Sequence, residues 1–129
     1  MIVAMGTSDT MASSGAQLDY YQSVIDTMGQ STVDAFARLY VVPHGGHGMS
    51  GKRFSVNGDG EPTDKSEIPD KFDRFSILQN WVENGVAPGK SEVVTGKSGT
   101  LPLCSYPNYP KYVSGDTSKA SSYTCASPW

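Results

Sequence analysis

Two short apolar runs and two amphipathic stretches dominate the hydrophobic pattern of this chain. The runs, Ile2–Met5 and Leu39–Val42, are uninterrupted and are followed by glycine or proline, as buried strands often are. Between them, apolar residues recur at helical spacing from about Gly15 to Met28, and Gly29 follows as a helix-ending residue. This order predicts a βαβ unit, in which a right-handed helical crossover joins two parallel strands.

The rest of the pattern is weaker, and it predicts the following elements. A capping box at Ser14-Gly-Ala-Gln17 starts the first helix, and a connector follows it up to Phe36. A long polar surface loop is predicted over 49–70, followed by a helix over 74–84 that Asp73 precedes and Gly85 closes. A short strand over 92–95 and loops from 97 to 129 complete the chain. Together these elements predict an α/β fold with parallel strands, flanking helices and a loop-rich C-terminal segment.

Length and charge narrow the class of protein. The chain has 129 residues, enough for one domain, and a net charge of −3 with a pI of about 5.2. This balance argues against nucleic acid or an anionic membrane surface as the main partner. No apolar run approaches the roughly 20 residues that span a bilayer. The first residues lack the basic and apolar regions of a signal peptide, so we expect any export signal to lie upstream.

The two cysteines, Cys104 and Cys125, lie in segments rich in Ser, Tyr, Pro and Gly. They are either a disulfide of an exported protein or two reduced thiols of a cytosolic one. Their even number and their loop-type surroundings favour the disulfide.

Asp9 and His47 are the strongest candidates for chemistry. Each follows a predicted strand, so both loops are expected at one edge of the sheet, where a carboxylate can fix the tautomer of an imidazole and stabilise its charged form. The order Asp then His is also the order of the last two triad members in α/β-hydrolases. The alternatives are an aspartate that makes an Asx-turn or caps the next helix, and a solvated loop histidine.

Other chemistry has weaker support in the sequence. His44 and His47 form an H-x-x-H spacing, but it lies in a glycine-rich loop that imposes no metal geometry, and only Asp9 offers a further ligand. Asn57, Asp59 and Glu61 alternate as in calcium loops, but Pro62 stands where glycine is expected and position 68 is isoleucine. No metal site is therefore predicted.

A nucleophile is absent from the sequence. No G-x-S-x-G elbow occurs, since Lys52 stands where the second glycine should follow Ser50. Neither cysteine has a base near it in sequence.

Five short motifs occur in an order that resembles the C-terminal part of the tannase and feruloyl esterase family of α/β-hydrolases. They are Gly6-Thr-Ser-Asp9, Leu18-Asp-Tyr-Tyr21, Leu39-Tyr-Val-Val-Pro-His-Gly-Gly-His47, Phe75–Gly85 with its Asn80-Trp-Val-Glu-Asn-Gly stretch, and the closing segments Leu101–Pro107 and Ser114–Cys125. The resemblance covers nearly the whole chain, so residues 1–129 are interpreted as the C-terminal portion of a hydrolase domain whose nucleophile elbow and lid lie elsewhere.

The resemblance implies a serine esterase that acts on aromatic-acid esters, with Asp9 and His47 as two of its three triad members. It implies a secreted or periplasmic protein, no cofactor, and two partners: the ester and the remainder of the hydrolase domain. This chain alone is expected to be inactive, and unstable unless a partner completes its sheet. Gly48 stands where much of the family has a cysteine, so the His47 loop is expected to be held by packing alone. The alternative is a non-catalytic, secreted binding or interaction module.

Overall fold

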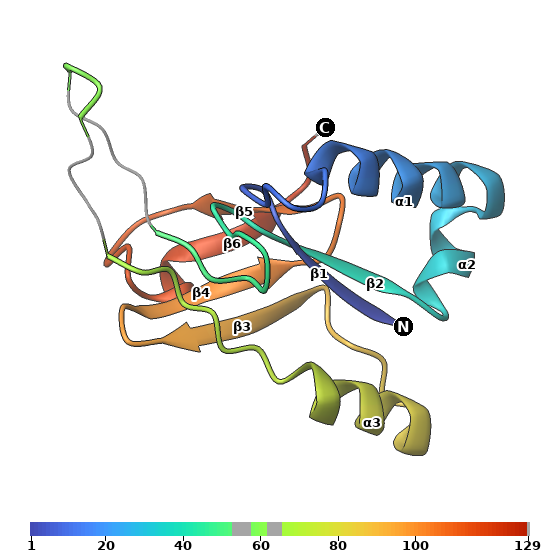
Figure 1. Cartoon of the computed structure of the whole chain (residues 1–129). Coiled ribbons are helices and arrows are strands. Elements are labelled where there is room, and N and C mark those ends of the chain that lie inside the picture. The colour runs from blue at the N-terminus through green and yellow to red at the C-terminus, as the bar shows by residue number, and fades with distance from the viewer. Residues whose placement is uncertain (53–57, 62–65, 129) are drawn as a thin grey trace.

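The computed structural model describes residues 1–52, 58–61 and 66–128 (Figure 1). The helices are α1 (Ser14–Met28), α2 (Gln30–Asp34), α3 (Arg74–Asn84) and the 3₁₀ helix η1 (Ala120–Ser122). The strands are β1 (Ile2–Gly6), β2 (Arg38–Val42), β3 (Ser91–Gly96), β4 (Gly99–Cys104), β5 (Tyr109–Tyr112) and β6 (Tyr123–Ala126).

The βαβ unit is present as β1, α1, α2 and β2. Strands β1 and β2 pair in parallel, with Ile2 opposite Arg38 and Gly6 opposite Val42. Because this register aligns the two carboxyl ends, the loops after β1 and β2 leave the sheet side by side.

The start of α1 and the connector after it differ from the sequence prediction. The N-cap is Ser13, whose hydroxyl accepts the Ala16 N–H at 3.3 Å, whereas Ser14 donates its hydroxyl to the Gly6 carbonyl at 2.8 Å. The predicted connector contains the short helix α2, which buries Val33 completely. One turn is too short to give a helical period in the sequence, and so the pattern did not reveal it.

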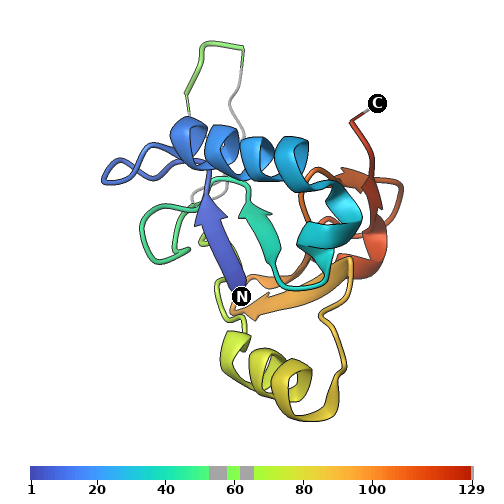
Figure 2. The ribbon, with the colours of Figure 1, turned by 90° about the vertical axis from the view of Figure 1, so that its right-hand side faces the viewer.

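The two faces of the β1–β2 pair form two separate hydrophobic clusters, because side chains alternate along a strand. The α-side cluster lies under α1 and α2, and consists of Met5, Tyr21, Val33, Ala37 and Leu39. The β-side cluster faces β3 and β4, and consists of Tyr40, Val42, Met49, Ile68, Val94 and Leu103. Figure 2 shows this arrangement, with α1 on one side of the pair and β3, β4 and α3 on the other. Each fully buried residue of this kind contributes about 1.5–3 kcal/mol.

The C-terminal third is richer in strands than the sequence predicts. A strand was expected only over 92–95, but β3–β4 and β5–β6 form two antiparallel pairs. Among the described residues, parallel pairing is limited to β1 and β2. The prediction of a loop-rich C-terminal segment is wrong, because strands β3 to β6 lie in it. Two of these strands contain a proline, Pro102 in β4 and Pro110 in β5, which hides them from a pattern that treats proline as a strand breaker. The predicted disulfide between Cys104 and Cys125 is present and ties β4 to β6.

The ends of the predicted surface loop over 49–70 belong to the core. Met49 and Ile68 are only 4% and 5% exposed, and Lys52 forms a β-bridge with Glu67. Helix α3 has the predicted bounds, with Asp73 as N-cap and Gly85 in the left-handed region at its end. Its apolar face is largely uncovered, since Phe75 and Val82 are each 76% exposed. Among the described residues, no helix has the length and apolar character needed to cross a membrane.

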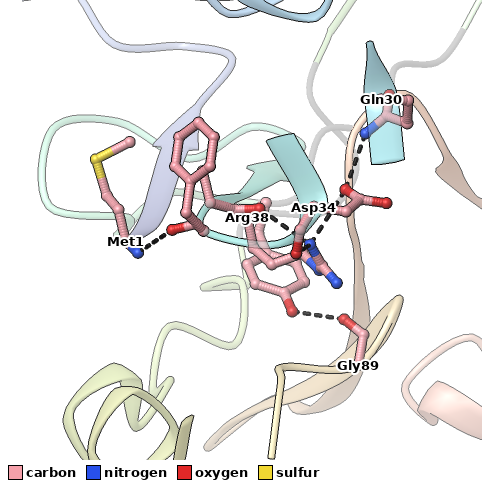
Figure 3. A network of polar contacts seen from close by, with 8 residues as sticks. Met1, Gln30, Asp34, Arg38 and Gly89 are labelled. Carbon is pink, nitrogen blue, oxygen red and sulfur yellow. Dashed lines mark hydrogen bonds and ion pairs between the residues drawn. The ribbon is translucent and has the colours of Figure 1, made fainter. Parts of the chain in front are cut away.

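A polar network fixes the amino end of β2 (Figure 3). The Arg38 guanidinium lies 3.1 Å from the Asp34 carboxylate and donates to the carbonyls of Asp34 and Ala37. It also lies 5.7 Å from the ring centroid of Trp81, which connects this end of β2 to α3. The terminal ammonium of Met1 donates to the Phe36 carbonyl.

Candidate active site

The candidate site lies at the opposite, carboxyl end of β1 and β2. There the Thr7 N–H donates to the Val42 carbonyl at 3.1 Å and the Ser8 N–H donates to the Gly45 carbonyl at 2.8 Å. The two loops are in such close contact that a Cβ atom on Gly6 would lie 2.0 Å from the Gly45 oxygen. Glycine is therefore required at position 6, and it lets the Asp9 loop lie directly against the His47 loop.

Asp9 is oriented by its own loop. Its Oδ1 accepts the N–H groups of Met11 at 2.8 Å and Ala12 at 3.0 Å, which is the Asx-turn arrangement considered as an alternative role. These two N–H groups, and then His47, hold the pKa of Asp9 below its ordinary value of 3.8. The turn and the chemistry are compatible, because the turn uses one carboxylate oxygen and leaves the other for a partner.

His47 is that partner. Its Nδ1 lies 3.1 Å from Asp9 Oδ2, although the two residues are 38 positions apart in the sequence. The side chain of His47 is 62% exposed, whereas that of Asp9 is 10% exposed. With Nδ1–H donated to Asp9, the second ring nitrogen, Nε2, carries the lone pair, and it forms no hydrogen bond to the residues that the structure describes. The arrangement is a solvent-facing imidazole with a well-held carboxylate behind it.

His44 plays a different part in this loop. Its backbone lies in the left-handed region with φ of 62°, and its N–H donates to the Thr7 hydroxyl at 2.9 Å. Within the described ranges, no group of three or more His, Cys, Asp or Glu side chains is placed to hold a metal ion. Of the calcium-like residues, Asn57 lies outside the described residues.

Packing holds the His47 loop, as the sequence predicts, but hydrogen bonds hold it too. Met49 places its side chain in the β-side cluster, and its N–H donates to the Gly46 carbonyl at 3.0 Å. The Gly46 N–H donates in turn to the Ser50 carbonyl at 2.7 Å. Thr7 and Met49 are parts of the site that the sequence does not predict. The only signal for Met49 was a lone apolar residue in an otherwise polar loop.

Comparison with known proteins shows the family of this chain. A family model described as "Tannase and feruloyl esterase" matches residues 1–126. The chain belongs to the tannase and feruloyl esterase family. Among its curated relatives in this family, an uncharacterised esterase of Agrobacterium fabrum is 35% identical over 132 residues, which cover 98% of this chain and 21% of the relative.

Two further family relatives extend the comparison. The mono(2-hydroxyethyl) terephthalate hydrolase of Piscinibacter sakaiensis is 32% identical over 136 residues, covering 99% of this chain and 20% of the hydrolase. The crystal structure of feruloyl esterase B from Aspergillus oryzae matches with a TM-score of 0.74 and 26% identity, over 97% of this chain and 26% of that one. The chain thus spans about a fifth of the length of the curated relatives it matches.

Proposed function

We propose that this chain carries the general base and the orienting carboxylate of a carboxylic ester hydrolase that works through a Ser-Asp-His triad. The observation that carries the proposal is the 3.1 Å contact between Asp9 Oδ2 and His47 Nδ1, with Asp9 shielded and His47 open to solvent. Membership of the tannase and feruloyl esterase family supports the reaction class.

In the proposed mechanism, His47 transfers protons and Asp9 stays ionised. Nε2 of His47 takes the proton of the serine hydroxyl while the serine oxygen attacks the ester carbonyl. The imidazolium then gives this proton to the departing alcohol, which leaves an acyl-enzyme. A water molecule then attacks the acyl carbonyl while His47 takes its proton. The imidazolium returns this proton to the serine oxygen as the acyl–serine bond breaks, which releases the acid and regenerates the serine. Asp9 orients the ring and offsets its charge in each step, and its lowered pKa keeps it available for this role.

The serine, the oxyanion hole and the lid are proposed to come from the remainder of a longer hydrolase domain, of which this chain is the C-terminal portion. Two features support such a partner. Among the described residues, β1 pairs with no strand except β2, and α3 leaves Phe75 and Val82 exposed. An open sheet edge and an apolar helix face are typical of surfaces that another part of a protein covers.

Aromatic-acid esters are the proposed substrates, because two relatives are named for hydrolysis of such esters. The proposed location is outside the cytoplasm, secreted or periplasmic, since the Cys104–Cys125 disulfide suits an oxidising compartment. The mechanism needs no metal or organic cofactor.

A chimera tests this function. This chain would replace the matching fifth of the Piscinibacter sakaiensis hydrolase, and the product would be assayed on mono(2-hydroxyethyl) terephthalate. We expect turnover by the chimera and none by the isolated chain. His47→Ala should reduce kcat at least about a thousandfold, whereas His44→Ala, the control histidine of the same loop, should not. Retained activity in the His47→Ala chimera would contradict the proposal.

A further inference from the structure

The position of the His47 imidazole must come from its backbone. The side chain is 62% exposed, so little packing restrains it, and its contact with Asp9 is one hydrogen bond. One hydrogen bond to Asp9 can orient the ring, but it does not place the backbone that carries the ring. The loop from His44 to Met49 must therefore be held at its two ends.

The carboxyl end of this loop is anchored in the core. Met49 has a φ of 76°, in the region that normally favours glycine, yet its side chain is only 4% exposed and packs in the β-side cluster. Methionine in this conformation is disfavoured by its Cβ atom, so burial of its side chain must hold the backbone there. Met49 lies two residues after His47 and gives the loop one fixed point.

The amino end is held by Thr7, which belongs to the other loop. Its N–H donates to the Val42 carbonyl at 3.1 Å, and its hydroxyl accepts the His44 N–H at 2.9 Å. His44 is also in the left-handed region, with φ of 62°. The Thr7 hydroxyl thus satisfies the N–H of a strained residue three positions before His47. In the chain, Thr7 is also only two residues before Asp9.

We propose that Thr7 is a positioning residue of the proton relay, which sets the distance between the Asp9 loop and the His47 loop without contacting either reacting side chain. The inference rests on the proposed function. Thr7 bonds to the end of β2 and to the start of the His47 loop, and it begins the turn that carries Asp9. The Ser8 N–H also holds this end of the loop, at the Gly45 carbonyl, but the Thr7 hydroxyl is the acceptor of the His44 N–H. Loss of this acceptor loosens the amino end of the His47 loop while Met49 keeps the other end in place.

The test uses the full 129-residue chain labelled with ¹⁵N-histidine. In alkaline buffer, where imidazole is neutral, the two ring nitrogen shifts report the tautomer of each histidine. The wild-type chain should hold His47 in the Nδ1–H tautomer, and Asp9→Asn should abolish this preference. Thr7→Val, which keeps the shape but removes the acceptor, should also lose the preference, and Thr7→Ser should restore it. Thr10→Val is the matched control in the same loop and should behave as wild type.

The outcomes separate the two proposals. A wild-type chain whose β2 amide signals show that it is folded, but which has no tautomer preference at His47, contradicts the proposed function itself. If the isolated chain is not folded, the same spectra are recorded on the chimera. If wild type and Asp9→Asn behave as expected but Thr7→Val keeps the full preference, the role of Thr7 is wrong and the function stands. Equal loss in Thr10→Val or Thr7→Ser would also overturn it, because the effect would then not depend on the hydroxyl. The β2 amide signals check that each variant is folded, and Thr7→Ala replaces Thr7→Val if the latter is not.

Discussion

Each end of β2 carries a pair of one acidic and one basic side chain. The distance within the two pairs is the same, but the shielded partner is the basic one at one end and the acidic one at the other. At the amino end, Arg38 and Asp34 are 3.1 Å apart, and at the carboxyl end His47 and Asp9 are also 3.1 Å apart. Figure 3 shows the first pair. Its cationic partner is the better shielded one, since the Arg38 side chain is 11% exposed and the Asp34 side chain 31%. In the second pair the carboxylate is the shielded partner, at 10%, and the imidazole is open.

The difference lies in what remains available for chemistry. The Arg38 guanidinium uses its donors on the Asp34 carboxylate and on two backbone carbonyls, and it packs near Trp81. Arginine also stays protonated at any working pH, so this pair can only hold structure. His47 presents a ring nitrogen to solvent, and imidazole is the side chain that proteins use most often as a general base. A short contact between an acidic and a basic side chain therefore indicates acid–base catalysis only where the exposed partner is a group that can exchange a proton with a substrate.

The largest expected effect is a difference in catalytic activity between variants of Asp9 and of Asp34. In the chimera with the Piscinibacter sakaiensis hydrolase, Asp9→Asn should lower kcat by about a thousandfold to ten-thousandfold, because the amide cannot hold the Nδ1–H tautomer or offset the imidazolium charge. Asp34→Asn is the matched control and should leave kcat within about twofold of the parent. Equal losses in both variants would mean that the carboxyl end has no special role.

The next largest effect is a difference in the free energy of unfolding between variants at the two ends of β2. Asp34→Ala should lower the free energy of unfolding of the chain by about 1–3 kcal/mol, because a mostly buried guanidinium loses its counter-ion. His47→Ala, which removes an exposed side chain, should change it by less than about 0.5 kcal/mol. Urea unfolding followed by circular dichroism measures both values. A larger loss for His47→Ala than for Asp34→Ala would reverse the comparison.

The smallest effect is a dependence on pH. The folded chain holds the pKa of Asp9 below 3.8, so the unfolded chain binds this proton first as the pH falls. The stabilisation by the Asp9 charge should be complete well above pH 3.8 and should fade as the pH falls through that value toward the lower folded pKa. The Tm difference between wild type and Asp9→Asn should therefore be constant near neutrality and close in acid. A Tm difference that becomes larger in acid would mean that folding raises the pKa of Asp9 and does not lower it.

Local sequence was sufficient to predict the βαβ unit and the pair at its edge. Ile2–Met5 and Leu39–Val42 pack against a hydrophobic cluster on each face of the sheet, so their apolar runs are continuous. The polar residues just after the two parallel strands must then meet at the strand ends. Asp9 and His47 follow from this rule together with the family resemblance.

Long-range contacts and proline-containing strands could not be predicted in the same way. The partners of Thr7 and Met49 lie in other segments of the chain, and nothing near these residues in sequence reveals them. Pro102 and Pro110 interrupt the alternation of β4 and β5, although register with β3 and β6 makes both segments strands. The N-cap was missed by one position because Ser13 and Ser14 are chemically equal, and only the contact between Ser14 and Gly6 distinguishes them.

Whether Asp9 orients His47 is measured by the tautomer of His47 in the wild-type chain, read from its two ring ¹⁵N shifts with His44 as internal reference. We expect Nδ1 of His47 to carry the proton and Nε2 the lone pair, and Asp9→Asn to remove this preference. A proton found on Nε2, or a mixture unchanged by Asp9→Asn, would show that the carboxylate does not orient the imidazole.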